Sequence, residues 1–486
     1  MRLDRLTEGC GIVSVNGDLG INITSVCNDS RKVAPGALFV AVKGYASDGH
    51  DYIMTAVEKG AAAIMYQDTA KVADIPEGIA LVQVESSRYA LAIASANFYD
   101  NPSRKLTLVG ITGTNGKTTT VTLLHRMFTS LGYNCGLLST IANYVGNRGS
   151  EAVNTTSDPL TINSLLSEMV DEGCEYCFME VSSIGVEQDR VAGLHFKAGI
   201  FSNLTHDHLD YHKTFAEYLR CKKLFFDTLP KDAYAITNID DRNGMVMTQT
   251  TKAKIVTYSL RSIADHSCRV VEQSFEGMLL RIDGKEVWTG LIGQHNAYNL
   301  LALYTTATTL GADPEETLIA ISALKPAPGR LENIRGPKGT SIIIDYAHTP
   351  DALENVLGTL REIAPGNELI CVFGCGGDRD KTKRPEMAQV AQKLADKIIV
   401  TSDNSRTERT ADIMADIKAG MDISGKAKSL FIEDREQAIR TAVMIASEGA
   451  TILLAGKGHE TYQIIGTEKT HFDEKEIVMN LINEMI

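Results

Sequence analysis

LTLVGITGTNGKT, residues 106–118, runs from a short apolar segment through a glycine-rich loop into a helical pattern that starts near Thr118. A strand that leads through glycines into a helix places backbone N–H groups where they can bind phosphate. The common phosphate-loop pattern has a glycine five residues before Gly116, but this chain has Ile111 there, so it matches a tighter variant. We therefore predict a nucleotide-binding loop, in which Lys117 neutralises the β and γ phosphates and the Thr118 hydroxyl binds Mg²⁺.

The segments on either side of this loop predict an α/β protein with three domains. Residues 1–103 combine short β-branched runs with a helical stretch, which is typical of a small α/β domain. Residues 104–336 alternate apolar strand candidates with helices, and this pattern predicts a central parallel sheet. Residues 337–486 show the alternation of a doubly wound, Rossmann-like sheet. The strand candidates are 176–181, 199–204 and 233–238 in the central part, and 341–345, 368–373, 397–401, 428–432 and 451–454 in the last.

Length and charge narrow the classes of protein that the chain can belong to. At about 150 residues per domain, 486 residues fit three domains. The 48 Lys and Arg residues against 61 Asp and Glu residues give a net charge of −13, which disfavours a nucleic acid as a partner. The chain has no apolar run long enough to cross a membrane and no apolar segment near its N-terminus, so we expect a cytoplasmic protein without membrane insertion. Nine cysteines scattered along the chain favour reduced thiols over a disulfide framework. Separately, we expect the protein to be a monomer.

Two strand ends near the phosphate loop carry groups that bind metals or transfer protons. Glu180 lies at the end of the strand candidate 176–181, and a carboxylate at that edge of the sheet suits Mg²⁺. The next strand leads into Asn203-Leu-Thr-His-Asp-His-Leu-Asp-Tyr-His212, whose histidines and aspartates also suggest zinc. The spacing alone does not provide the four tetrahedral ligands of a structural zinc site. A polar surface loop without a metal is a further alternative.

Lys222 falls on the apolar stripe of the helix predicted after that loop. A buried ammonium is costly unless it is paired or neutralised, and burial lowers the pKa of a lysine. From the pattern alone, the ordinary interpretation is a lysine whose ammonium reaches solvent. The alternative is a neutral amine that takes up CO₂ and becomes an anionic carbamate able to bind Mg²⁺. The stripe consists of Phe215, Tyr218, Leu219, Lys222, Phe225 and Phe226.

Several motifs together resemble those of the Mur ligase family, and the resemblance covers essentially the whole chain. It implies an N-terminal domain for the UDP end of the substrate, a central ATPase domain and a C-terminal domain for the incoming amino acid. The chain is most similar to the members that add the third residue of the peptidoglycan stem peptide. These use ATP to join an amino acid to UDP-N-acetylmuramoyl-L-Ala-D-Glu through an acyl phosphate. The motifs are Gly113-Thr-Asn-Gly-Lys-Thr118, Glu180-Val-Ser-Ser183, Asp207-His-Leu-Asp-Tyr-His212, Gln294-His-Asn296, Gly329-Arg330, Asp345-Tyr-Ala-His348 and Gly456-Lys-Gly-His-Glu460.

The resemblance also implies roles for individual residues. Mg²⁺ is expected at Thr118, Glu180, His208 and carbamylated Lys222, with Lys117 and His348 as further catalytic residues. For His348, proton transfer and simple positioning both stay open. The residues expected to bind ATP are Gly113, Thr114, Asn115, Gly116, Lys117, Thr118, Asn296, Arg330 and Asp345. Those expected at the UDP-muramoyl dipeptide are Ser30, Tyr45, Ala46, Ser47, Asn154, Thr155, Thr156, Ser182, Gln188 and Arg190, and those expected at meso-diaminopimelate are Arg379, Asp403, Asn404, Ser405, Arg406, Gly456 and Glu460.

The sequence at 403–406, Asp-Asn-Ser-Arg, bears on which amino acid is added. Family members that add meso-diaminopimelate carry Asp-Asn-Pro-Arg there. Arg406 is kept, and its planar guanidinium suits the distal carboxylate of diaminopimelate, which L-lysine lacks. Ser405 replaces the rigid proline, so we expect the loop to hold Arg406 less firmly. Diaminopimelate is therefore the expected substrate, and addition of L-lysine, which leaves Arg406 idle, is the nearer alternative.

Two other functions are compatible with an ATPase core. A folylpolyglutamate synthetase shares that core but lacks the loop at 403–406 and the N-terminal UDP domain. A regulatory or scaffold protein that binds ATP without turnover is the alternative from another class. The complete set of Lys117, Thr118, Glu180, His208 and Lys222 argues against such a silent protein.

Overall fold

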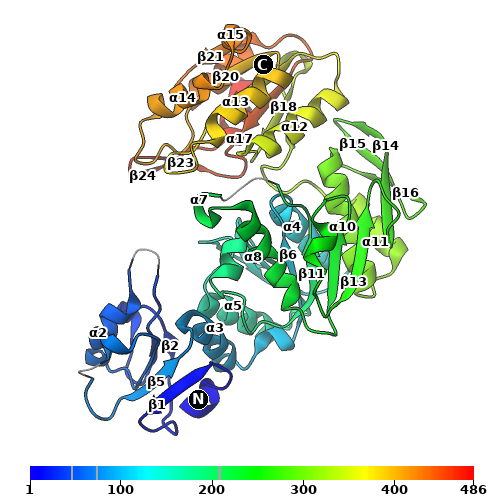
Figure 1. Cartoon of the computed structure of the whole chain (residues 1–486). Helices are drawn as coiled ribbons and strands as arrows, with labels where there is room; N and C mark the ends of the chain where they lie inside the picture. The colour runs from blue at the N-terminus through cyan, green and yellow to red at the C-terminus, as the bar shows by residue number, and fades with distance from the viewer. Residues whose placement is uncertain (45–46, 73–74, 206–208, 486) are drawn as a thin grey trace.

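Three large β-sheets follow one another along the chain and define its domains. The computed structural model describes residues 1–44, 47–72, 75–205 and 209–485. In Figure 1 the N-terminal domain (blue), the central domain (cyan to green) and the C-terminal domain (yellow to red) are three separate α/β bodies, with the central domain between the other two. The α/β architecture with three domains that the sequence predicts is confirmed.

The N-terminal sheet has the strand order β1-β5-β4-β3-β2 and is parallel except at its β1 edge. Helix α3 covers this sheet and also packs against α5 of the central domain. The strands are β1 (Ile12–Asn16), β2 (Val26–Cys27), β3 (Leu38–Val40), β4 (Ala63–Tyr66) and β5 (Ala80–Val84). The helices are α1 (Leu3–Leu6), α2 (Ile53–Glu58) and α3 (Ser87–Phe98), with short 3₁₀ turns at Ser30–Lys32, Gly49–Tyr52, Thr69–Lys71 and Pro102–Arg104.

The central sheet has the order β16-β15-β14-β13-β12-β11-β6-β10-β7-β8-β9. Strands β13, β12, β11, β6, β10 and β7 are parallel, and α4, α10 and α11 cover one face while α5, α8 and α9 cover the other. The strands are β6 (Thr107–Thr112), β7 (Cys135–Leu138), β8 (Ala142–Val145), β9 (Arg148–Glu151), β10 (Tyr176–Glu180), β11 (Phe196–Phe201), β12 (Tyr234–Asn238), β13 (Lys254–Ser259), β14 (His266–Ser274), β15 (Gly277–Ile282) and β16 (Lys285–Thr289). The helices are α4 (Lys117–Ser130), α5 (Pro159–Asp171), α6 (Ser183–Glu187), α7 (Leu209–His212), α8 (Phe215–Asp227), α9 (Gly244–Met247), α10 (Gln294–Thr309) and α11 (Pro314–Ser322).

The C-terminal sheet has the order β17-β18-β22-β19-β20-β21 and is doubly wound. Helices α12, α13 and α14 pack on one face and α16 and α17 on the other, so its strands are buried on both sides. The strands are β17 (Glu332–Arg335), β18 (Ser341–Asp345), β19 (Leu369–Phe373), β20 (Lys397–Val400), β21 (Ser429–Phe431) and β22 (Thr451–Ala455), with the hairpin β23 (Tyr462–Ile465) and β24 (Glu468–His471). The helices are α12 (Pro350–Ile363), α13 (Lys383–Leu394), α14 (Thr410–Ala419), α15 (Ile423–Ala427), α16 (Arg435–Ile445) and α17 (Glu474–Met485), with a 3₁₀ turn at Pro337–Gly339.

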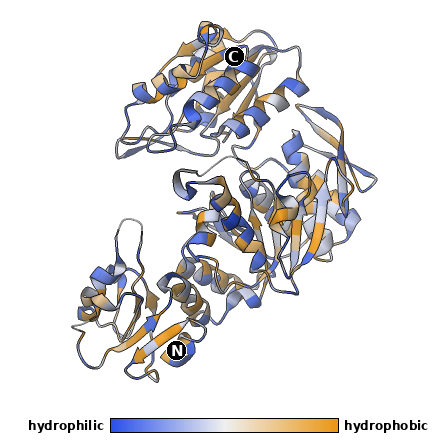
Figure 2. Ribbon diagram, viewed as in Figure 1, coloured by the Kyte–Doolittle hydropathy of each residue, from blue (hydrophilic) through white to orange (hydrophobic). Residues whose placement is uncertain are grey.

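Burial follows the apolar runs of the sequence. Figure 2 shows apolar residues concentrated on the strands, while many of the helices that cover them carry polar residues. Each of the nine cysteines is a buried free thiol, in agreement with the expectation of reduced thiols. In the part of the chain that the structure describes, no helix has both the length and the apolar character that crossing a membrane requires.

One detail differs from the expected organisation. Strand β17 pairs antiparallel with β18 and is therefore the edge strand of the C-terminal sheet. The boundary expected between residues 336 and 337 thus falls between two strands of one sheet. The chain changes sheets earlier, near Pro326-Ala-Pro-Gly329, which is the stiff, turn-forming segment before β17.

Candidate active site

The phosphate loop joins β6 to α4 and packs tightly against its neighbours. Gly116, directly before α4, has a φ of +86°, a left-handed conformation that favours glycine. A Cβ on Gly116 would lie 2.6 Å from Oδ1 of Asn299, and a Cβ on Gly113 would lie 1.9 Å from Oγ of Ser202. Glycine is therefore required at both positions for the loop to adopt this shape at the start of α4.

Asn203 and Lys117 hold the phosphate loop by hydrogen bonds. The backbone N–H groups of Thr114 and Asn115 donate to the backbone carbonyl and the Oδ1 of Asn203, at 2.8 and 2.9 Å. The Lys117 Nζ donates to the carbonyl oxygens of Gly113 and Thr114, both at 2.8 Å. The loop thus has one defined conformation, and the Lys117 ammonium lies beside the backbone that is predicted to bind phosphate.

Lys222 is buried against the same loop. Its side chain is 1% exposed, its Nζ donates to the carbonyl oxygen of Gly113 at 2.8 Å, and the ammonium lies 4.7 Å from the centre of the Tyr218 ring. The neighbouring Lys223 is partly exposed and pairs with Asp227 at 2.7 Å. The interpretation of Lys222 as a lysine that reaches solvent is therefore wrong, because the apolar face of α8 packs inward and carries the amine with it.

Glu180 presents a carboxylate oxygen that fits a divalent cation. The residue is 0% exposed, and its Oε1 accepts a hydrogen bond from the backbone N–H of Thr140 at 2.8 Å. Its Oε2 is buried and accepts no hydrogen bond from the described residues. A buried carboxylate oxygen without a donor, in a cleft that Thr118 and Lys222 also line, suits Mg²⁺ coordination. The predicted ligand His208 lies outside the described residues, as do Tyr45 and Ala46.

A polar segment continues from Glu180 towards α6. Thr156 Oγ1 donates to the backbone carbonyl of Glu180 and accepts from the backbone N–H of Ser182, both at 3.0 Å. The Arg190 guanidinium donates to the Thr156 carbonyl at 2.6 Å and to Oε1 of Gln188 at 2.8 Å. This chain of contacts orders the residues expected at the muramoyl dipeptide beside the candidate metal ligand.

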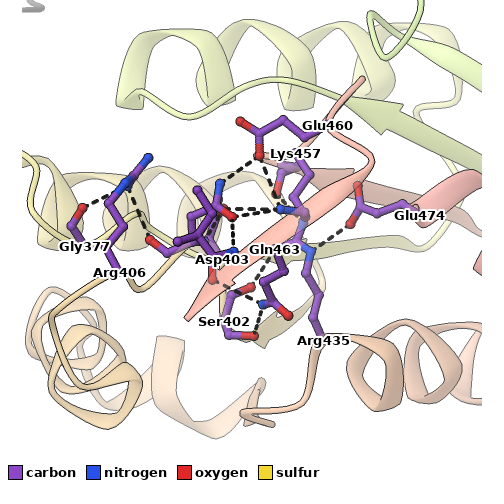
Figure 3. A network of polar contacts seen from close by, with 12 residues as sticks. Gly377, Ser402, Asp403, Arg406, Arg435, Lys457, Glu460, Gln463 and Glu474 are labelled. Atoms are coloured by element: carbon purple, nitrogen blue, oxygen red, sulfur yellow. Dashed lines mark hydrogen bonds and ion pairs between the residues drawn. The ribbon is translucent and has the colours of Figure 1, made fainter. Parts of the chain in front are cut away.

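The loop 403–406 follows β20 and lines the C-terminal side of the cleft. Figure 3 shows the network of polar contacts around Asp403 and Arg406. The Asn404 Nδ2 donates to Oε2 of Glu460 at 2.8 Å, and its Oδ1 accepts from the Lys457 ammonium at 3.3 Å. Arg406 has a φ of +50°, and its guanidinium donates to the carbonyl oxygen of Gly377 at 2.9 Å. The loop is thus held from two sides, although it lacks the proline.

Buried charges beneath the loop set its electrostatics. The fully buried Arg435 guanidinium pairs with Glu474 at 2.8 Å and donates to backbone carbonyls at the ends of β20 and β22. Burial raises the pKa of the Asp403 carboxyl, but Arg435 and Lys457 outweigh that effect, so the pKa lies below its usual range. Burial raises the pKa of Glu460 despite the nearby Lys457. Asp403 is therefore a fixed anion next to the cleft.

These parts line one cleft of about 550 Å³ between the central and C-terminal domains. A hydrogen bond links the two domains, in which the Asn115 Nδ2 donates to Oδ2 of Asp351 at 2.9 Å. The Arg330 guanidinium lies 4.6 Å from the centre of the Tyr346 ring. The expected site residues that line the cleft are Thr114, Asn115, Gly116, Lys117, Thr118, Asn154, Thr155, Thr156, Glu180, Ser182, Arg190, Lys222, Arg330, His348, Arg379, Asp403, Asn404, Arg406, Gly456 and Glu460.

Some expected site residues lie elsewhere. The Asn296 amide donates to the carbonyl of Ile292 at 2.8 Å and accepts from Asn299, next to the phosphate loop. The Asp345 carboxylate accepts from the backbone N–H groups of Leu331 and Ala347, which holds the loops around Arg330, and burial raises its pKa. Ser405, within the loop 403–406, is buried and is not among the residues that line the cleft. Neither Gly113 nor Gln188 is among the residues that line the cleft, and Ser30 and Ser47 lie in the N-terminal domain.

Sequence reasoning missed several residues that line the cleft. Thr140 lies between β7 and β8 and has no local motif to mark it, since only the fold brings it to Glu180. Lys383, the first residue of α13, donates to the carbonyl oxygen of His348 at 3.0 Å. Tyr346 and Ser183, in contrast, lie inside motifs that the sequence already displayed. The other residues missed are Thr119, Ile184, Thr349, Pro350, Gly376, Asp380, Thr382 and Glu386.

A glycine-rich loop before a helix, a buried carboxylate and a charged loop of a second α/β domain line one cleft, an arrangement that suits a nucleotide-dependent ligase. Family models match three segments of the chain. They are the Mur ligase family catalytic domain at residues 22–105, the Mur ligase middle domain at 111–307 and the Mur ligase glutamate ligase domain at 329–458. The chain belongs to the Mur ligase family.

Individual relatives agree with this assignment. A protein of Bacteroides fragilis named UDP-N-acetylmuramoyl-L-alanyl-D-glutamate--2,6-diaminopimelate ligase is 50% identical over 484 residues, which cover 99% of each chain. A solved structure of an enzyme of that name is 31% identical, with a TM-score of 0.70, and covers 100% of this chain and 99% of its own. A folylpolyglutamate synthase of Mycobacterium tuberculosis in complex with ADP is 18% identical and covers 76% of this chain, with a TM-score of 0.61, so it shares the fold alone.

Proposed function

We propose that this chain joins meso-diaminopimelate to the γ-carboxylate of D-glutamate in UDP-N-acetylmuramoyl-L-Ala-D-Glu, with ATP as co-substrate. Its full-length identity of 50% to a diaminopimelate-adding relative supports this reaction. The observation that carries the proposal is the shared cleft, in which the phosphate loop and the loop with Arg406 line one space. A ligase needs this arrangement, because the activated carboxyl group and the attacking amine must meet.

The reaction consists of two displacements. A γ-carboxylate oxygen of D-glutamate attacks the γ-phosphorus of ATP, the bond to the β-phosphate bridge oxygen breaks, and ADP leaves. The amine of diaminopimelate then attacks the acyl carbon, and the tetrahedral intermediate releases phosphate and a proton. Two anions must approach each other in the first step, so positive charge at the phosphate loop is the main requirement.

The residues of the central domain meet this requirement. Backbone N–H groups at the start of α4 face the phosphates, and Lys117 turns from the loop carbonyls to the β and γ phosphates when ATP binds. Thr118, Glu180, His208 and carbamylated Lys222 would hold Mg²⁺, which supplies charge screening and Lewis acidity for phosphoryl transfer. Arg190, Thr156 and Ser182 orient the dipeptide so that its carboxylate points to the loop.

The C-terminal domain binds the amino acid whose amine attacks the acyl phosphate. Arg406 and Arg379 bind the distal carboxylate of diaminopimelate, and Asp403 and Glu460 bind the ammonium group that does not react. In both cases a charged side chain pairs with a substrate group of opposite charge. His348, which follows β18, lines the same cleft and either transfers a proton or positions the amine. The N-terminal domain, with Ser30 and Ser47, binds the UDP end. All of these residues come from one chain, so the proposed active unit is a monomer.

The proposal is tested by phosphate release with ATP, Mg²⁺ and UDP-N-acetylmuramoyl-L-Ala-D-Glu, with meso-diaminopimelate and L-lysine compared side by side. We expect release with diaminopimelate and a loss of about 100-fold in kcat/KM in Arg406→Ala, because the distal carboxylate loses its charged partner. Arg409→Ala is the matched control, since Arg409 is an exposed arginine that does not line the cleft. Release with lysine, unaffected by Arg406→Ala, would reject the assignment of diaminopimelate, and release with neither amine would reject the ligase.

A further inference from the structure

Two neighbouring loops of the C-terminal domain carry Arg379 and Arg406, which line its side of the cleft. Arg379 lies in the loop 374–380 after β19, and Arg406 lies in the loop 402–408 after β20. Because β19 and β20 are paired parallel strands, both loops leave the same edge of the sheet side by side. The spacing of the two guanidinium groups therefore depends on how these loops are held together.

Backbone contacts join the two loops closely. The Gly377 N–H donates to the carbonyl oxygen of Asn404 at 2.9 Å, and the Arg406 guanidinium donates to the Gly377 carbonyl, also at 2.9 Å. A Cβ on Gly377 would lie 1.9 Å from the carbonyl oxygen of Ser405. The loops thus approach at a distance that only a glycine at 377 permits.

Glu408 and Arg384 form a charged link between the loop 402–408 and α13, the helix that follows the loop 374–380. The Glu408 carboxylate accepts two hydrogen bonds from the Arg384 guanidinium, at 2.9 and 3.1 Å, and one from the backbone N–H of Asp378 at 2.7 Å. The Arg384 side chain is fully buried and also lies 3.3 Å from the carbonyl oxygen of Gly376. The Thr407 hydroxyl donates to the Asp378 carboxylate at 2.7 Å. The contacts of Glu408 and Thr407 with Asp378 tie the loop of Arg406 to the residue before Arg379, and the Glu408–Arg384 pair ties the same loop to the first turn of α13.

We propose that the Glu408–Arg384 pair is a positioning element for the amino-acid substrate, which fixes the spacing of Arg379 and Arg406 and thereby the preference for an amino acid with a second carboxylate. The pair supplies rigidity that the loop lacks because Ser405 stands where a proline would restrict the backbone. The Glu408 N–H also donates to the Ser405 carbonyl at 3.1 Å. This inference rests on the proposed function, because it assigns a residue pair to the same amino-acid site.

Asp416 offers a matched control for this pair. It is the other carboxylate partner of Arg384, at 2.8 Å, and it lies on α14, half exposed. Asp416 is not among the residues that line the cleft. If Arg384 only stabilised the domain, removing either carboxylate charge would have similar effects, whereas a positioning role predicts that only Glu408 affects the amino-acid substrate.

The experiment compares wild type, Glu408→Gln and Asp416→Asn in steady-state phosphate release. We expect Glu408→Gln to raise the KM for diaminopimelate about tenfold, because small misplacements of binding groups are costly, and to lower the preference for diaminopimelate over lysine. Its kcat and its KM for ATP should stay within about twofold of wild type, as should every constant of Asp416→Asn. Glu408→Asp keeps the charge and should recover part of the affinity.

Other results would overturn either the positioning role of Glu408 or the proposed function. An unchanged KM for diaminopimelate in Glu408→Gln, or an equal rise in Asp416→Asn, would overturn the positioning role. Absence of diaminopimelate-dependent phosphate release in the wild type would instead reject the proposed function. If Glu408→Gln fails to fold, Glu408→Asp replaces it, since the shorter side chain cannot keep both contacts with the Arg384 guanidinium. That variant should raise the same KM, and an unchanged value would overturn the inference.

Discussion

Lys222 places an amine against the phosphate loop, where a charged side chain is unexpected. Its Nζ lies 2.8 Å from the carbonyl oxygen of Gly113, inside a stripe of aromatic and apolar residues on α8. The sequence predicts this stripe and the place of the lysine on it from spacing alone. What the pattern cannot supply is the depth of burial, because that depends on how α8 packs against β6 and the loop after it.

We predict that Lys222→Ala lowers kcat on the order of 100-fold, because the candidate metal site loses an anionic ligand. A short-chain carboxylic acid should restore part of the activity of this variant by occupying the space of the carbamate. The measurement is phosphate release with and without the acid. Lys223→Ala, on the same helix but directed at Asp227, serves as the control and should retain activity. Full activity of Lys222→Ala would remove the carbamate from the mechanism.

The residues that hold the specificity loop show where prediction from sequence ends. Arg406 could be predicted, since the motif at 403–406 and the geometry of a guanidinium both point to a carboxylate. Glu408 and Arg384 could not, because they lie 24 residues apart and meet only when β19 and β20 pair. Asn296 was predicted at the nucleotide, yet in the structure its amide is engaged with Ile292 and Asn299. Its contact with ATP stays a prediction.

At the scale of elements, the loop between β6 and α4 is the part of the fold that the sequence defines best. A run of apolar residues, then glycines, then a helical pattern allows few alternatives. Edge strands were harder to predict. Strand β17 and the hairpin β23–β24 have weak apolar patterns because much of their surface faces solvent, and their pairing is decided by the partner strand.

Helix α4 permits a direct test of the loop. We predict that Gly116→Ala impairs ATP binding, because its Cβ would meet Asn299 at 2.6 Å and its left-handed φ costs about 1 to 2 kcal/mol for alanine. The measurement is the KM for ATP together with the melting temperature. The matched control is Gly132→Ala, just beyond the other end of the same helix, with a φ of +96° and no atom within 4 Å of the added Cβ.

The two glycine variants should share the conformational cost and differ in function. Both should lower the melting temperature through this cost, Gly116→Ala further because of its contact with Asn299, whereas only Gly116→Ala should raise the KM for ATP. Equal KM values for the two variants would show that the loop shape at Gly116 does not matter for nucleotide binding.

On the scale of the whole molecule, the cleft brings together candidate functional residues that lie far apart in the sequence. The phosphate loop, Glu180 and the loop 403–406 lie on two different sheets, and Asn115 contacts Asp351 across the gap between the domains. The sequence predicts the domains and most of the cleft residues through family motifs, but it gives no measure of how the domains face each other. The expected UDP-binding residues Ser30 and Ser47 are not among the residues that line this cleft and lie in the N-terminal domain.

The central claim is that one cleft activates a carboxylate with ATP and passes it to an amine. It is tested most directly with substrate whose D-glutamate γ-carboxylate is labelled with ¹⁸O, followed by mass spectrometry of the released phosphate and of the product. We predict one ¹⁸O atom in the phosphate and the other in the new amide, because the carboxylate oxygen that attacks phosphorus leaves with it. Unlabelled phosphate formed together with amide product would contradict the acyl phosphate route and the account of the site built on it.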